Sequence, residues 1–74
     1  SREEKMMKTR YLELPTHATT IQLEPIFWDA LDTASAGNWK GWVLTFLREK
    51  PKDVNRSSWI RQRIMKLYMH QNLP

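Results

Sequence analysis

The stretch that decides the fold is Ala18-Thr19-Thr20-Ile21-Gln22-Leu23-Glu24-Pro25-Ile26-Phe27-Trp28-Asp29-Ala30-Leu31. Its first half alternates, with Thr19, Ile21 and Leu23 on one face and Ala18, Thr20 and Gln22 on the other. This period of two is typical of a strand that buries one face. After Pro25 the apolar positions follow helical spacing, and proline suits the first turn because its missing N–H has no partner there. The stretch predicts a strand over 18–24 and a helix over 25–36.

A single strand needs a partner strand, and the simplest source is a second copy of the same chain. Within the chain, only residues 9–14 offer another short strand or extended arm that could fold back. The chain has 74 residues, no cysteine and 41% hydrophobic residues, including four Trp. A chain this short can bury so many hydrophobic residues more completely in a core that two copies share. We therefore expect an obligate homodimer held by an intermolecular β-ribbon.

Two further helices follow from the sequence. Residues 39–49 place apolar side chains at the i, i+3, i+4, i+7, i+8 positions of one helical face. Gly37 is expected to stop the preceding helix in a left-handed conformation, and Asn38 to cap the next one. Asn55 is expected to cap a third helix over 56–70. The predicted organisation is a flexible basic arm over 1–8 and one mainly α domain over 9–74.

The net charge is +4 and is unevenly distributed. Residues 15–36 contain no Lys or Arg, whereas residues 37–74 contain eight. This asymmetry fits a polyanionic partner, and it equally fits a solvated basic face that keeps the protein soluble. No apolar run reaches the length of a membrane span, so we expect a cytoplasmic protein.

Catalytic and metal-binding patterns are missing from the sequence. It has no Gly-rich phosphate loop, no cysteine nucleophile and no carboxylate pair in an evident pocket. His17 has no second His or Cys at metal-ligand spacing, and a turn histidine with a structural hydrogen bond is the favoured interpretation. We expect neither an enzyme nor a cofactor.

Four motifs in order carry a resemblance to a known family. They are His17 before the strand, then Thr20-Ile21-Gln22-Leu23-Glu24, Phe27-Trp28-Asp29-Ala30-Leu31 and Asn55-Arg56-Ser57-Ser58. Over residues 9–70 the chain resembles the ribbon-helix-helix DNA-binding proteins. The resemblance implies a homodimer whose two-stranded ribbon enters the DNA major groove, here with an additional C-terminal helix.

The resemblance and the strand phase together imply the contact residues. Base contacts are expected from Ala18, Thr20 and Gln22, with Gln22 able to pair bidentately with adenine. Phosphate contacts are expected at the start of the helix over 39–49, where free N–H groups and a partial positive charge suit an anion. The expected phosphate contacts are Asn38, Trp39 and Lys40, with Lys8 from the arm and Arg10 from the segment that follows it.

The sequence departs from the family pattern in two places. Ala18 stands where this branch often has Arg or another long polar residue, so base readout depends more on Gln22 and Thr20. The helix over 39–49 is rich in Trp where small or aliphatic residues are usual. The expected function is a sequence-specific double-stranded DNA-binding dimer, a transcriptional repressor. The alternative is a protein-interaction module, antitoxin-like or binding a phage or host factor, that uses its Trp-rich helices.

Overall fold

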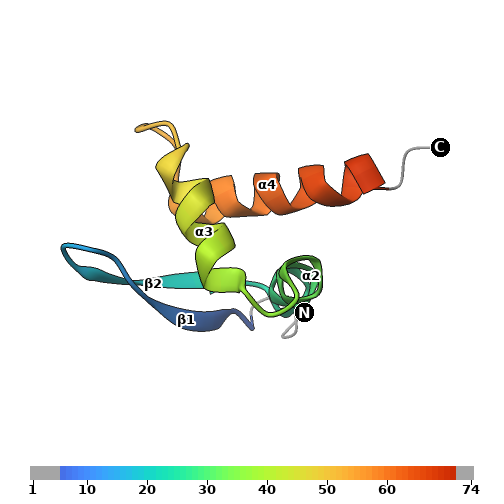
Figure 1. The fold of residues 1–74 in the computed structure, drawn as a ribbon, viewed down its shortest axis with the longest axis horizontal. Coiled ribbons are helices and arrows are strands. Elements are labelled where there is room, and N and C mark those ends of the chain that lie inside the picture. The colour runs from blue at the N-terminus through green and yellow to red at the C-terminus, as the bar shows by residue number, and fades with distance from the viewer. Residues whose placement is uncertain (1–5, 72–74) are drawn as a thin grey trace.

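The computed structural model describes residues 6–71 of the chain. Two strands, β1 (Lys8–Glu13) and β2 (Ala18–Leu23), precede three helices, α2 (Pro25–Ser35), α3 (Trp39–Arg48) and α4 (Arg56–Gln71). Each element agrees with its predicted range to within one residue at either end. In Figure 1 the hairpin of β1 and β2 lies below α3 and α4, and its turn points away from α2. No helix in the described part is long and apolar enough to cross a membrane.

The two strands pair with each other inside one chain. They form an antiparallel sheet in which Arg10 lies opposite Ile21 and Tyr11 opposite Thr20. In the turn, the backbone N–H of Leu14 donates to the carbonyl of His17 over 2.7 Å. Within the chain, β1 therefore supplies the partner of β2 that was expected from a second copy, and the predicted pairing between two chains stays a prediction. A connection this short costs little loop-closure entropy, which favours pairing within the chain.

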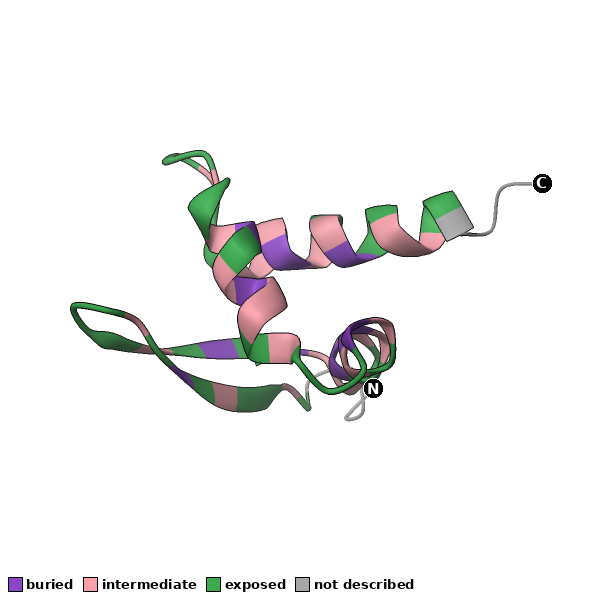
Figure 2. Cartoon of the chain, viewed as in Figure 1, coloured by how far each residue is buried: buried purple, intermediate pink, exposed green. Residues whose placement is uncertain are grey.

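The predicted phase of β2 is confirmed by burial. Ile21 and Leu23 are buried and Thr19 is half-buried, whereas Ala18, Thr20 and Gln22 are exposed. Both strands and all three helices contribute to one core, as Figure 2 shows by the buried segments on each of them. The buried hydrophobic residues are Leu12, Ile21, Leu23, Trp28, Leu31, Val43, Phe46, Ile60 and Ile64. The chain therefore completes a core without a second copy, which removes the argument for an obligate dimer.

The helix ends differ from expectation at one junction. Helix α2 ends at Ser35, and the first left-handed residue is Ala36 with φ 53°, followed by Gly37 with φ 90°. Gly37 is thus the second of two left-handed residues that follow the helix, and its N–H donates to the carbonyl of Asp32 over 3.0 Å. Asn38 occupies the N-cap position of α3, but its side chain makes no capping hydrogen bond. At α4 the expected cap is present, because Asn55 Oδ1 accepts from the N–H of Ser58 over 3.1 Å.

Tryptophan and tyrosine side chains fasten the elements together. Trp28 Nε1 donates to the carbonyl of Lys8 over 2.8 Å, which joins α2 to β1. Trp59 Nε1 donates to the carbonyl of Phe46 over 2.7 Å, which joins α4 to α3. The hydroxyl of Tyr68 donates to the carbonyl of Ala30 over 2.9 Å, which joins α4 to α2. Each polar atom of these large side chains is satisfied where the apolar part packs, as burial requires.

Candidate nucleic-acid interface

The hairpin presents one face that the core does not use. Along each strand, side chains alternate between the two faces of the sheet. The exposed side chains form three cross-strand pairs, Thr9 with Gln22, Tyr11 with Thr20 and Glu13 with Ala18. We call these six residues the outer ribbon face. The three predicted base-contact residues, Ala18, Thr20 and Gln22, all lie on it.

The other half of the outer ribbon face comes from β1 and was not among the predicted site residues. Thr9, Tyr11 and Glu13 are exposed, and Tyr11 retains 59% of its accessible surface. The signal for them is in the sequence, because these three residues alternate with Arg10 and Leu12. Only the pairing of β1 with β2 brings them beside Gln22, Thr20 and Ala18.

The chemistry of the outer ribbon face matches base edges. Glutamine can bond adenine bidentately, a carboxylate can accept from the amino group of cytosine, and alanine can contact the thymine methyl group. Threonine and tyrosine hydroxyls both donate and accept. A two-stranded ribbon is also narrow enough to enter the major groove. The only charge on this face is the carboxylate of Glu13, so attraction to phosphates has to come from its surroundings.

Exposed cationic side chains lie at the starts of β1, α3 and α4. Lys8 is exposed at the start of β1. Lys40 is exposed in the first turn of α3, with its ammonium 5.8 Å from the centre of the Trp39 ring. Arg56, at the start of α4, is exposed and donates through Nη1 to Thr19 Oγ1 on β2. Arg56 is not among the predicted phosphate contacts, because only the folded chain places the start of α4 beside β2.

Asn38 and Trp39 lie at the start of α3, where the first N–H groups of a helix have no acceptor inside it. Asn38 is exposed, whereas Trp39 is half-buried and packs edge-on against Trp28 with ring centres 5.3 Å apart. The side chain of Trp39 is therefore part of the packing, and its backbone N–H is the group left for an anion.

Arg10 lies on the inner face of the ribbon, where its guanidinium is already engaged. Nη1 and Nη2 donate to the two carboxylate oxygens of Asp32 over 2.8 and 2.9 Å. The guanidinium also lies 4.4 Å from the ring centre of Trp28 and 5.1 Å from that of Trp39. A phosphate at Arg10 would have to compete with this arrangement, which ties β1 to α2 and α3.

The ion pair between Arg10 and Asp32 changes the pKa of both side chains. The hydrogen bonds to Arg10 hold the pKa of Asp32 below its ordinary value, and those to Asp32 raise the pKa of Arg10. A second pair acts similarly, since Arg61 Nε donates to Glu24 Oε1 over 2.8 Å and lowers the pKa of Glu24. Both carboxylates therefore favour the folded state most when they are ionised.

Replacing Asp32 tests this coupling. A carboxylate whose pKa is lowered in the folded state contributes stability above its unfolded pKa of about 3.9, and this stability is lost as the pH falls below it. Asp32→Asn should lower the free energy of unfolding at pH 7 by about 1 kcal/mol or less, because the pair is partly exposed. The difference from the unmodified chain should shrink toward pH 3, as urea denaturation over a pH series would measure.

The matched control is Asp29→Asn, which removes the same charge about one turn earlier on α2 and leaves the bonds to Arg10 in place. A larger loss for Asp29→Asn than for Asp32→Asn would contradict the structural role given to the Arg10 pair. So would a difference between Asp32→Asn and the unmodified chain that grows as the pH falls.

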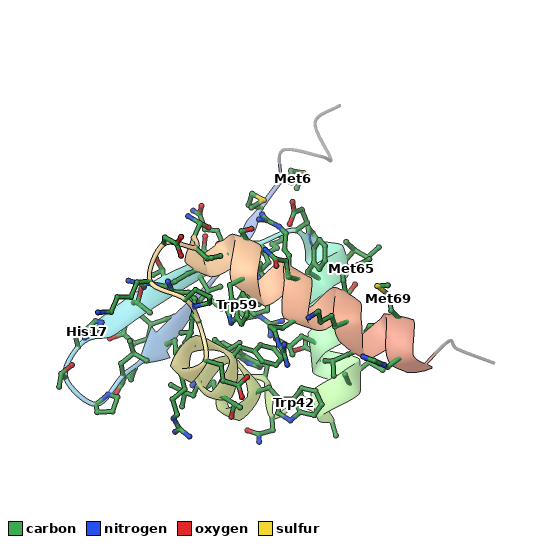
Figure 3. All side chains as sticks on the ribbon, turned by 90° about the horizontal axis from the view of Figure 1, so that it is seen from above. Met6, His17, Trp42, Trp59, Met65 and Met69 are labelled. Carbon is green, nitrogen blue, oxygen red and sulfur yellow. The ribbon has the colours of Figure 1, made fainter. Side chains whose placement is uncertain are left out.

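His17 and the basic residues farther along α4 lie away from the outer ribbon face. His17 sits in the hairpin turn, as Figure 3 shows, and its Nδ1 lies 3.0 Å from Thr16 Oγ1, in agreement with a structural role. Arg63 lies over the Trp59 ring, 5.6 Å from its centre, and 4.0 Å from Glu49. Lys66 and His70 are exposed farther along α4, which extends beyond the hairpin in Figure 1. Residues 1–5 of the predicted arm lie outside the described residues, and Lys8, its last residue, begins β1.

Comparison with known proteins supports the family to which the motifs point. No curated protein and no solved structure matches the chain. The model of the ribbon-helix-helix domain family matches residues 7–68, which include both strands and most of the three helices. The chain therefore belongs to the ribbon-helix-helix domain family, a family of DNA-binding regulators.

Proposed function

We propose that this chain is a sequence-specific double-stranded DNA-binding protein that inserts its hairpin into the major groove and acts as a transcriptional repressor. The observation that carries the proposal is the outer ribbon face, whose six exposed side chains are not part of the core. Family membership supports DNA as the partner. The sequence isoelectric point of 9.8 is consistent with a polyanionic ligand.

In this proposal Gln22 and Thr20 make the hydrogen bonds that identify bases, and Ala18 contacts a thymine methyl group. Tyr11 and Thr9, their cross-strand neighbours, add donors and acceptors from β1. Phosphates are contacted by Lys8, by Lys40, and by the backbone N–H groups that follow Asn38. Arg56 is added to this set because it lies beside β2. Arg10 joins the ribbon to the helices through its hydrogen bonds to Asp32, so it is not proposed as a phosphate contact.

Two substitutions separate base reading from phosphate binding. Gln22→Ala should weaken binding to the preferred site by roughly 1–3 kcal/mol and binding to random duplex much less, because a base contact is lost. Lys40→Ala should weaken both by a similar factor and reduce the slope of log affinity against log salt by about one. Fluorescence anisotropy with a site selected from random duplexes, measured over a salt series, gives both quantities.

Equal weakening of selected and random duplexes by Gln22→Ala would contradict the proposed reading face. A salt slope near zero for the unmodified chain would contradict DNA binding through phosphates altogether. It would instead favour an apolar protein partner, whose interface responds little to salt.

The protein-interaction alternative was based on the Trp-rich helices. A partner surface made of tryptophans needs them exposed, whereas Trp28 is buried and the other three are half-buried. Two of the four, Trp28 and Trp59, also donate their N–H groups to carbonyls inside the molecule. Their packing therefore favours a structural use of these side chains and leaves DNA binding as the better-supported function.

We further propose that two copies associate through a groove between α2 and α4, because β1 already pairs with β2. The groove has a volume of about 400 Å³ and is lined by Ile26, Phe27, Asp29, Ala30, Thr33, Ile64, Met65 and Tyr68. Ile26 and Met65 are 72% and 51% exposed, and Met69, which follows Met65 along the same side of α4 in Figure 3, is 62% exposed. Asp29 is exposed on α2 and Lys66 on α4. The two helices that line the groove therefore carry exposed charges of opposite sign, which an association of two copies can use.

A charge placed in the groove tests this dimer. Met65→Glu should shift the equilibrium toward monomer by at least tenfold, because the carboxylate would be buried at an apolar contact. Folding should persist, since Met65 is exposed in the single chain. Sedimentation equilibrium measures the association, and Gln62→Glu, a matched charge on an exposed α4 position outside the groove lining, is the control. An unmodified chain that stays monomeric at high micromolar concentration would contradict the dimer.

A further inference from the structure

The first two turns of α4 contact the end of β2 that carries Gln22. Ser57 Oγ donates to the backbone carbonyl of Gln22 over 2.9 Å. One helical turn later, Arg61 Nε donates to Glu24 Oε1 over 2.8 Å. Four residues of an α-helix advance about 6 Å and two residues of a strand about 6.7 Å, so the two contacts have matching spacing. Helix α4 therefore lies along the end of β2 and holds it at two successive points.

The backbone carbonyl of Gln22 is available to Ser57 because of the strand register. In an antiparallel pair, residues that exchange backbone hydrogen bonds with the partner strand alternate with residues that turn these groups away. The N–H of Leu14 donates to the carbonyl of His17. Counted from this pair along the register, Gln22 lies opposite Thr9 in a pair of the second kind. The hydroxyl of Ser57 thus bonds a carbonyl that β1 leaves free.

Both sides of this contact are attached to the core. At the start of α4, Asn55 Oδ1 accepts from the N–H of Ser58, and Ile60 is buried. On β2, Leu23 follows Gln22 and is also buried. The side chain of Gln22 is exposed on the opposite face of the strand. The backbone that carries Gln22 is therefore held from the inside while its amide faces outward.

We propose that Ser57 is a positioning residue for Gln22 in base recognition. Its hydroxyl fixes the peptide plane that follows Gln22, and with it the direction in which the Gln22 amide meets a base edge. This inference rests on the proposed DNA-binding function. Bidentate pairing with adenine needs both amide atoms in place at once, and such a group has to be held within about 0.5 Å by supporting contacts. Both partners of the contact belong to the same chain, so it does not depend on how many copies bind the DNA.

Replacing the hydroxyl tests the proposal, with a duplex selected from random sequence by the unmodified chain. At the base pair where Gln22→Ala loses discrimination, Ser57→Ala should reduce it about two- to tenfold, as one lost hydrogen bond predicts. Ser57→Thr retains the hydroxyl and should restore the discrimination. Ser58→Ala is the matched control, because Ser58 Oγ accepts from Gln62 on α4 itself. This control should leave discrimination unchanged.

A double-mutant cycle separates positioning from a general effect on folding or affinity. In a chain that already carries Gln22→Ala, Ser57→Ala should cause no further loss of discrimination, because no amide is left to position. Equal losses with and without the Gln22 side chain would overturn the inference, as would equal weakening of selected and random duplexes. If Gln22→Ala has its expected effect and Ser57→Ala has none, the inference alone is refuted. If Gln22→Ala affects no base pair, the proposed reading face is refuted, and the inference with it.

Discussion

Ile21→Asp is expected to leave the chain unfolded at pH 7. Ile21 is 1% exposed and packs in the centre of the core under the hairpin. Removing its side chain from the core costs about 2–5 kcal/mol, and burying a carboxyl group without a partner adds several more. A 74-residue domain has a free energy of unfolding of only about 4–11 kcal/mol. Far-ultraviolet circular dichroism and urea denaturation would measure the loss of helix and of cooperative unfolding.

Thr20→Asp is the matched control, because it introduces the same group one residue earlier on the opposite face of β2. Thr20 is exposed, so this variant should fold. It should also bind DNA less well, since its new carboxylate would meet the groove. A folded Ile21→Asp chain, or an unfolded Thr20→Asp chain, would show that the strand faces are assigned the wrong way round.

The strand faces and helix ranges could be predicted because they depend on local periodicity. Alternation over 18–23 and helical spacing after Pro25 fix which side chains of each element turn inward. Periodicity says that β2 must pair but not with which strand. Residues 8–13 offer only Leu12 as a buried apolar residue, so their own pattern is weak. The short turn between β1 and β2 decides that these two strands pair with each other. The hydrophobic pattern of a strand does not contain that information, because it does not depend on the length of the turn.

The candidate site was predictable to the extent that it lies on β2. Gln22 and Thr20 follow from the phase of one strand, whereas Tyr11 becomes part of the site only through cross-strand pairing. Arg10 shows the opposite case, since a basic residue in a charged segment resembles a phosphate contact. Its partner Asp32 lies 22 residues away, and no local pattern indicates that contact.

The largest loss expected from removing one aromatic side chain is at Trp28. Trp28→Ala should lower the free energy of unfolding by about 3–5 kcal/mol, as for other buried tryptophans. The indole is 2% exposed, donates to the carbonyl of Lys8 and supports the guanidinium of Arg10. Its removal should therefore loosen β1 from the helices as well as open a cavity. Urea denaturation gives the stability, and hydrogen exchange of the β1 amides gives the local effect.

Two variants separate these contributions. Trp28→Phe keeps an aromatic ring but lacks the N–H donor, so it should be intermediate in stability and still expose the β1 amides, because the Lys8 carbonyl loses its partner. Trp42→Ala removes the same side chain from a half-buried position on α3 and should cost less, with β1 protection unchanged. If Trp42→Ala loosened β1 as much as Trp28→Ala does, the attachment of the ribbon would depend on general core packing. If only the Trp28 variants loosen it, the bond from Trp28 to Lys8 is what holds the reading surface on its helices.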